Sequence, residues 1–279
     1  MSEALGRWVG RSQSERDTPG ALRVTELAAT LDDPRPYVAG AELPPGWHWI
    51  LFHTVAPTGI LTVDGHAPRG GFLPPVKLPR RMWAGGRLRF HRSLHVDEPV
   101  ERISEIAAVT EKTGRNGQLV FVTVRHRLHG PLGLAIEEEQ DIVYREAAAG
   151  SAPPQPPPHA SPVWTKDVRT NEALLFRYSA LIFNAHRIHY DRDYAAKIEG
   201  YGGLVVHGPL IATYLLELAR ERRPDGRLAA FSYRGVSPLF DTAPFRVCGQ
   251  PSVDARAVEL WAETPQGALA MTGRAEFAA

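Results

Sequence analysis

The sequence lacks several features that would assign it to a particular class of protein. Its 279 residues contain a single cysteine, Cys248, so no disulfide can form within the chain, as is usual in a reducing compartment. No apolar run approaches the roughly eighteen residues of a membrane-spanning helix, and the N-terminal segment lacks the apolar core of a signal peptide. The net charge is only +1. We therefore expect a cytoplasmic protein that binds neither nucleic acid nor membrane.

Apolar residues make up 43% of the chain, enough to build the core of one large domain or two ordinary ones. The clearest boundary is a stretch rich in alanine, serine and proline that includes the letters PPQPPP. Such a composition cannot pack a core and is typical of a spacer. We predict an N-terminal domain over residues 1–147, a linker over 148–163 and a C-terminal domain over 164–279.

The N-terminal half predicts a helix followed by a sheet. Apolar residues have helical spacing over residues 22–31, and the glycines and prolines of residues 65–86 exclude regular structure there. From residue 87 the apolar period becomes two, which predicts successive antiparallel strands. They are expected over residues 88–96, 100–110, 119–128 and 134–144. The three adjacent acids Glu137–Glu139 are expected to be mostly solvated.

The C-terminal half repeats this plan. Leu174, Phe176 and Tyr178 are expected on one face of the segment before an apolar helix, which begins at Gly208 and ends near Arg222. Strands are expected over residues 228–236, 244–248, 257–264 and 268–277. Two helix-and-sheet units predict an α+β fold in which the sheets join edge to edge, leaving fewer exposed edge strands.

Residues 179–208 hold the densest group of reactive side chains. Four of them lie within eight residues: Asn184, His186, His189 and Asp191. His207 follows and precedes Gly208, which opens the apolar helix. A histidine and carboxylate cluster can supply a general base, and a glycine at a helix N-terminus can offer a free N–H to developing negative charge.

Other interpretations of this cluster are open. The spacing His-x-x-His-x-Asp offers three metal ligands, but no further ligand lies at a confirming distance along the chain. Ser179 could be a nucleophile, but no nucleophile-elbow motif surrounds it. The histidines could also be satisfied loop side chains. We favour a metal-free acid/base site, because several such residues are concentrated beside a helix start.

This segment resembles the active-site segment of the MaoC-like hydratases and dehydratases, which have the hotdog fold and act on acyl thioesters. Their pattern is Asp-x-Asn-Pro-x-His-x-Asp, followed about twenty residues later by a His-Gly that opens the central helix. His189 matches the catalytic histidine of that pattern, Asp191 its trailing Asp and Gly208 the helix-opening glycine. Asn184 stands at the position of the catalytic Asp, and His186-Arg187 replaces Asn-Pro. The resemblance implies a double hotdog.

A second match lies within residues 65–86. The letters GFLPP and RRMWAGG resemble a subgroup of that family, the type 2 hydroxyacyl-thioester dehydratases and their mesaconyl-CoA hydratase relatives. Arg80 and Arg81 stand beside Trp83, which suits an anion site for the phosphates of CoA with Trp83 as a stacking face. The alternative is a rigid surface loop with solvated arginines.

The resemblance implies a hydro-lyase that uses no metal or other cofactor and takes a CoA thioester as its substrate. In this scheme His189 is the base, Gly208 donates to the thioester oxygen, and Asp191 either orients His189 or returns the proton. Asn184 cannot transfer a proton but can hold the water or position the thioester. His186 and His207 are expected to contact the substrate.

The acyl group implied is mesaconyl or itaconyl, hydrated to citramalyl-CoA as in itaconate degradation, with Arg187 pairing with a substrate carboxylate. Two alternatives are a general dehydratase of 3-hydroxyacyl thioesters, on CoA or acyl carrier protein, and a non-catalytic acyl-CoA-binding protein. Whether the chain forms a homodimer is left open.

Overall fold

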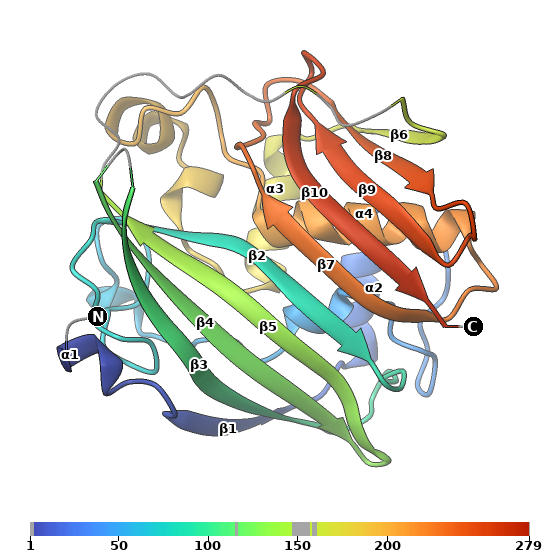
Figure 1. Cartoon of the computed structure of the whole chain (residues 1–279), viewed down its shortest axis with the longest axis horizontal. Coiled ribbons are helices and arrows are strands. Elements are labelled where there is room, and N and C mark those ends of the chain that lie inside the picture. The colour runs from blue at the N-terminus through green and yellow to red at the C-terminus, as the bar shows by residue number, and fades with distance from the viewer. Residues whose placement is uncertain (1–2, 115–116, 147–156, 158–160, 279) are drawn as a thin grey trace.

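The computed structural model describes residues 3–114, 117–146, 157 and 161–278. In these residues ten strands form one antiparallel sheet, and the strands of the two halves of the chain lie side by side in it (Figure 1). The first half contributes, in spatial order, β1 (Ser12–Asp17), β3 (Val100–Gly114), β4 (Gly117–Gly130), β5 (Gly133–Arg145) and β2 (Arg80–Phe90). The second half continues with β7 (Leu228–Gly235), β10 (Leu269–Phe277), β9 (Ala257–Glu263), β8 (Phe245–Pro251) and β6 (Trp164–Val168).

The two halves meet where β2 pairs with β7. The register runs from Gly85 opposite Arg234 to Arg89 opposite Ala230, so the junction is built from backbone hydrogen bonds. This pairing confirms the predicted edge-to-edge union of two helix-and-sheet units, and it removes one edge strand from each half.

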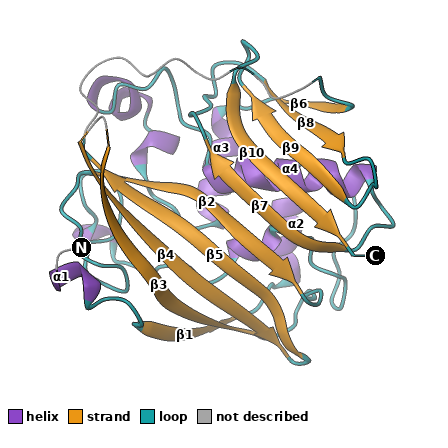
Figure 2. Cartoon of the chain, in the orientation of Figure 1, coloured by secondary structure: helices purple, strands orange, loops and turns teal. Residues whose placement is uncertain are grey.

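Helices cover one face of the sheet (Figure 2). The longest, α4 (Gly208–Arg222), packs against β8, β9 and β10, and its residues from Leu210 to Ala219 are all buried. Pro209 lies in the first turn of α4. A backbone N–H there has no acceptor within the helix, so the N–H that proline lacks costs no hydrogen bond. α2 (Ala21–Thr30) packs against α3 (Glu172–Leu181). The short helices are α1 (Glu3–Gly6), η1 (Trp47–Ile50), η2 (Thr58–Ile60), η3 (Arg187–His189) and η4 (Tyr194–Ile198).

Several expectations about local structure were wrong, among them the strand expected over residues 88–96, which ends at Phe90. Strand β2 begins at Arg80, inside the stretch expected to be irregular, because it finds hydrogen-bonding partners in β5 and β7. The segment before the cluster is helix α3, so Phe176 and Tyr178 diverge around the helix: Phe176 is 66% exposed and Tyr178 only 1%. Glu138 is buried rather than solvated, because His48 and the indole N–H of Trp49 bond its carboxylate.

The predicted linker lies almost wholly outside the described residues. The last strand of the first half ends at Arg145, and the first strand of the second half begins at Trp164. The proposed domain limits stay a prediction. Among the described helices, none is both long and apolar enough to span a bilayer.

The junction supplies a test of the fold. A Cβ atom added at Gly85 would lie 2.5 Å from the carbonyl oxygen of Tyr233, an atom of the neighbouring backbone that cannot move alone. We expect Gly85→Ala to lower the free energy of unfolding by roughly 1–3 kcal/mol, the usual cost of overpacking. Denaturant unfolding measures this change. Gly59→Ala is the control, because a Cβ there meets nothing within 4 Å. Equal stability of the two variants would contradict the packing at the junction.

Candidate active site

Residues 182–191, the reactive loop, follow α3 and are held in place by hydrogen bonds of the backbone. The chain turns at Phe183, which has a φ of 50°, and passes through η3. Asp191 then begins the next helical segment, because its Oδ1 accepts the N–H of Tyr194 at 3.0 Å. A hydrogen bond of 2.9 Å from the N–H of Val205 to the carbonyl of Ile188 ties the loop to the strand-like segment before α4. The loop is therefore held against the start of that helix.

His189 is buried, with one nitrogen committed and the other free. Its Nδ1 lies 2.7 Å from the carbonyl oxygen of Val205, so Nδ1 carries the proton and Nε2 keeps its lone pair. Nε2 has no hydrogen-bond partner among the described residues. Burial lowers the pKa of His189 to about 4, although the Val205 carbonyl opposes this shift. The imidazole is therefore neutral near pH 7 and can accept a proton at Nε2.

His207 stacks on His189 at the start of α4. The two ring centroids are 3.6 Å apart with an interplanar angle of 18°. The Nε2 atom of His207 lies 2.8 Å from the Oγ of Ser179, so this serine is committed to holding a ring in place. Burial, together with the charges that His189 and His186 would carry, holds the pKa of His207 well below its usual value. A second neutral imidazole, that of His207, is therefore stacked on the ring of His189.

Gly208, the first residue of α4, brings the helix N-terminus close to strand β2. A Cβ atom at this position would lie 3.3 Å from Cε3 of Trp83. The N–H groups of a first helical turn have no intrahelical acceptor, and the helix dipole favours negative charge there. The sequence prediction of a helix opening at Gly208, next to His207, is confirmed.

The structure adds two residues that sequence reasoning missed, Asp64 and His66. The Oδ2 atom of Asp64 lies 2.9 Å from Nδ1 of His66. The ring of His66 lies 4.1 Å from that of His186, centroid to centroid, and the ring of His186 lies 5.5 Å from that of His189. Four imidazoles thus follow one another from His66 to His207. The only sequence signal was that Asp-Gly-His comes at the start of the long segment rich in glycine and proline.

Gly65 makes this contact between the two halves possible. It has a φ of +90°, and a Cβ there would lie 1.8 Å from the carbonyl oxygen of Ala185. The carbonyl of Asp64 also accepts the N–H of Arg187 at 2.9 Å. Only glycine lets the two loops approach so closely. Burial in this contact, with the charges of His66 and His189, lowers the pKa of His186 to about 2.

The three ligands of the disfavoured metal alternative do not form a ligand group among the described residues, but another set does. Asp191 pairs with Arg187, whereas, among the described residues, ligand atoms of Asp64, His66 and His186 lie within 4.8 Å of one another. Both oxygens of Asp64 are already hydrogen-bonded, Oδ1 by Thr62 and the N–H of His66, and Oδ2 by the His66 ring. This arrangement suits an oriented imidazole better than an ion.

Three residues of the predicted site bind other parts of the protein. The Oδ1 atom of Asn184 accepts the N–H of His186 at 3.0 Å and so shapes the loop. Asp191 does not orient His189, because its Oδ2 pairs with Arg187 at 2.7 Å and the Val205 carbonyl fixes the ring instead. Arg187 also donates to the carbonyl of Val63 at 3.1 Å, so its guanidinium is not free for a substrate carboxylate.

The predicted phosphate-binding residues differ from expectation as well. Arg80 donates to the carbonyl of Glu199 at 3.0 Å and pairs with its carboxylate at 3.3 Å, so it holds the loop after η4. Arg81 lies near enough to His66 for its charge to lower the pKa of that histidine, after the larger effect of burial. The Trp83 ring packs within 5.2 Å of Trp49, centroid to centroid, rather than standing free for a nucleotide. Because β2 starts at Arg80, these side chains belong to the sheet and the site wall.

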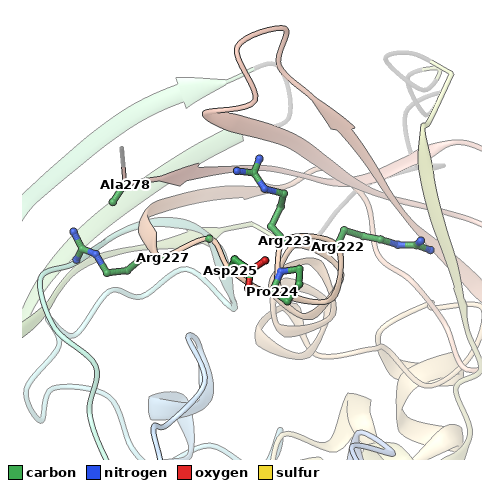
Figure 3. A pocket seen from close by; sticks show the side chains of 7 residues that line it. Arg222, Arg223, Pro224, Asp225, Arg227 and Ala278 are labelled. Carbon is green, nitrogen blue, oxygen red and sulfur yellow. The ribbon is translucent and has the colours of Figure 1, made fainter.

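A separate hollow of about 550 Å³ lies at the far end of α4 (Figure 3). Arg222, Arg223 and Arg227 line it. The fifteen residues of α4 span about 22 Å at the usual rise, so this hollow is remote from Gly208 and the imidazoles. Arg223 is also engaged, with its guanidinium carbon 4.8 Å from the centre of the Phe277 ring.

Comparison with known proteins identifies the family of the chain. The family model described as hydroxyacyl-thioester dehydratase type 2 matches residues 46–241. The chain belongs to this family. It is 47% identical over 276 residues to mesaconyl-C(4)-CoA hydratase of Chloroflexus aurantiacus, covering 97% of this chain and 96% of that one. It is 32% identical over 231 residues to the mitochondrial hydroxyacyl-thioester dehydratase type 2 of Schizosaccharomyces pombe, covering 74% and 77%.

Solved structures show the same fold. HtdX of Mycobacterium tuberculosis aligns with a TM-score of 0.66 at 18% identity, over 96% of this chain and 100% of that one. A MaoC-like dehydratase from Phytophthora capsici aligns with a TM-score of 0.70 at 12% identity, over 100% and 98%. A further M. tuberculosis protein, described as having a double hotdog fold, aligns with a TM-score of 0.51 at 13% identity, over 97% and 96%. The predicted double hotdog fold is confirmed. Because the chain belongs to the type 2 hydroxyacyl-thioester dehydratase family, it is a hydro-lyase.

Gly65 provides a test of the contact between the two loops. We expect Gly65→Ala to force the Asp64–His66 segment away from Ala185 and to lower activity at least tenfold. Gly70→Ala is the matched control, because Gly70 also has a φ of +90° but its Cβ would meet only Pro75, at 3.5 Å. Both variants lose roughly 1–2 kcal/mol to left-handed strain, so enzyme assays beside unfolding curves separate the two effects. Equal activity of the two variants would contradict the contact.

The buried neutral histidines predict acid sensitivity. Burial lowers the pKa of His189 to about 4 and that of His186 to about 2, whereas both regain a value near 6.5 when unfolded. Above about pH 6.5 both histidines are neutral in the folded and the unfolded chain and do not make stability depend on pH. As the pH falls from there toward the folded values, the unfolded chain takes up protons first, and the free energy of unfolding falls by up to about 1.4 kcal/mol per pH unit for each histidine. Burial raises the pKa of Glu217 to about 7, which acts in the opposite direction.

Denaturant unfolding at pH 7 and pH 5.5 measures this dependence. We expect wild type to lose stability on acidification and His186→Asn to lose less, because one protonatable group has been removed. Identical pH slopes for the two proteins would show that His186 is not held neutral by the fold.

Proposed function

We propose that this chain hydrates an α,β-unsaturated acyl-CoA, or dehydrates the corresponding hydroxyacyl-CoA, without a metal or other cofactor. The observation that carries the proposal is the geometry of His189. A buried neutral imidazole has its Nδ1–H fixed by Val205 and its Nε2 free, beside the N-terminus of a buried helix. This combination supplies a base for water and a donor for the thioester oxygen.

The reaction can be written with these groups alone. Nε2 of His189 takes a proton from water as the water oxygen forms a bond to Cβ of the substrate. The π electrons move onto the thioester oxygen, giving an enolate that the Gly208 N–H and the dipole of α4 stabilise. The imidazolium then returns the proton to Cα as the enolate collapses. Atoms and charge balance, and dehydration follows the same steps in reverse.

The acyl group we propose is a short unsaturated one with its own carboxylate. The support is the 47% identity to a mesaconyl-C(4)-CoA hydratase and the neutral Asn184 at the position of a family carboxylate. A carboxylate there would repel a dicarboxylic substrate by roughly 1–4 kcal/mol at 4 Å, depending on the dielectric. Arg187 contributes less than expected, because Asp191 occupies it. Itaconyl-CoA as a substrate and a role in itaconate degradation remain predictions.

A general dehydratase of 3-hydroxyacyl thioesters is the second candidate. The description of the matching family and the S. pombe relative favour it. The engaged guanidinium of Arg187 also favours it, since this cation is then not free to pair with a substrate carboxylate. A cytoplasmic location and a homodimer stay predictions under either candidate.

The base can be tested by substitution. We expect His189→Asn to lower kcat by at least about a hundredfold, the lower range for loss of a general base. His126→Asn is the control, because His126 is also a buried histidine, with Nδ1 bonded to a serine hydroxyl at 2.8 Å, but lies in the N-terminal sheet. Rates are followed at the enoyl-thioester absorbance, per folded enzyme. If His189→Asn kept more than half of the wild-type kcat, His189 would not be the base.

Substrate charge can be tested at Asn184. Asp is nearly isosteric with Asn and can accept the same N–H of His186, so Asn184→Asp keeps the loop and adds a charge. We expect its ratio of kcat/KM for mesaconyl-CoA over crotonyl-CoA to fall at least fivefold from wild type. Arg187→Ala should leave this ratio nearly unchanged, because Asp191 already holds the arginine. A wild type that prefers crotonyl-CoA would favour the general dehydratase.

A further inference from the structure

The site has a neutral side chain where the MaoC pattern has its acid/base carboxylate. Asn184 cannot accept a proton, and its Oδ1 is committed to the N–H of His186. Water has two O–H bonds, and His189 alone offers one lone pair to one of them. A second acceptor beside His189 would hold the other O–H and fix the direction of the water lone pairs.

The N-terminal half supplies an oriented imidazole at this place. Asp64 lies 2.9 Å from Nδ1 of His66, which puts the ring proton on Nδ1 and the lone pair on Nε2. The His66 side chain is 18% exposed, and its Nε2 has no hydrogen-bond partner among the described residues, so this atom is open to a small molecule. Asp64 is itself fixed, because Thr62 and the N–H of His66 bond its other oxygen.

The negative charge of Asp64 suits the Asp64–His66 pair to a position beside a base. Burial alone would raise the pKa of Asp64, but the hydrogen bonds from His66 and Thr62 outweigh it and hold that pKa far below its usual value. The carboxylate is therefore negative throughout the working range. The rings of His66 and His189 both lie beside the ring of His186, at centroid distances of 4.1 and 5.5 Å.

We propose that His66, oriented by Asp64, is a catalytic residue that holds the attacking water together with His189. This inference rests on the proposed hydratase function. One O–H of the water donates to Nε2 of His189, which takes that proton, and the other donates to Nε2 of His66, which stays neutral. A lone pair of the water oxygen is then directed at Cβ, and the proton on His189 passes to Cα.

The assignment gives Gly65 and the β2–β7 junction a functional reason. The Asp64–His66 pair comes from the first half of the chain and His189 from the second, so neither half holds the water alone. The contact of Gly65 with Ala185 and the bond from Arg187 to the Asp64 carbonyl set the position of the pair. Asp64 acts through His66 and is a positioning residue.

The test is chemical rescue of a truncated variant. We expect His66→Ala to lower kcat ten- to a hundredfold and free imidazole in the assay to restore at least a fifth of the loss, saturably. Asp64→Asn should lower kcat at least tenfold, because an amide can donate to Nδ1 and move the ring proton to Nε2. The controls are His95→Ala and Glu98→Gln, since this pair has the same 2.9 Å contact to Nδ1 but lies beyond the other end of β2. Both controls should keep wild-type kcat.

Several outcomes would overturn the assignment. They are full activity of His66→Ala, loss of activity that imidazole does not restore, and activity lost to a chelator and regained with zinc, which would make the cluster a metal site. Failure of the broader function looks different: wild type would then not turn over enoyl-CoA at all. If wild type is active and His189→Asn inactive while His66→Ala is unaffected, the hydratase function stands and the role of His66 alone fails.

Discussion

Backbone hydrogen bonding between β2 and β7 is the constraint on which the rest of the structure depends. It joins the sheets of the two halves into one and removes an exposed edge from each. It also fixes where the loops before β2 lie relative to the loops before α4. Gly85, Gly65 and Gly208 each sit at a close approach in this region, where a Cβ would meet a backbone or aromatic atom of another segment. The chemistry of the site is thus set by how the halves meet.

Burying imidazoles has a cost in free energy when they become charged. A buried histidine that became charged without a partner would be expensive, so the fold keeps His189 and His207 neutral. A neutral imidazole whose Nδ1–H is fixed by a carbonyl is the form that can accept a proton at Nε2. The same burial that destabilises the protein at low pH therefore prepares the base. Low pKa values at functional sites often have this double meaning.

Much of the architecture could be predicted from the sequence. Period-two patterning gave β3, β4 and β5 to within a few residues, and the apolar run after Gly208 gave α4 with its correct ends. The prediction failed where tertiary context overrides local pattern. Strand β2 begins in a segment rich in glycine and proline because two neighbouring strands pair with it, and Glu138 is buried because partners distant in sequence satisfy it.

Part of the site could also be predicted from the local sequence. His186, His189 and His207 are close in sequence and occupy one segment, so local motif reasoning brought them together. Asp64 and His66 are more than a hundred residues away and reach the loop only through the folded junction. Arg187 and Asp191 form an ion pair with each other, a contact that spacing alone does not distinguish from contact with substrate.

The most direct test of a metal-free acid/base site is solvent-proton incorporation during hydration. Metal-free, chelator-treated enzyme is given an enoyl-CoA in D₂O, and the product is analysed by proton NMR. The account predicts full turnover and one deuterium at Cα, in a single stereochemical position, because His189 takes a deuteron from the attacking water and returns it to one face of the enolate. A product without deuterium at Cα, deuterium in both Cα positions, or turnover only after metal is added would contradict it.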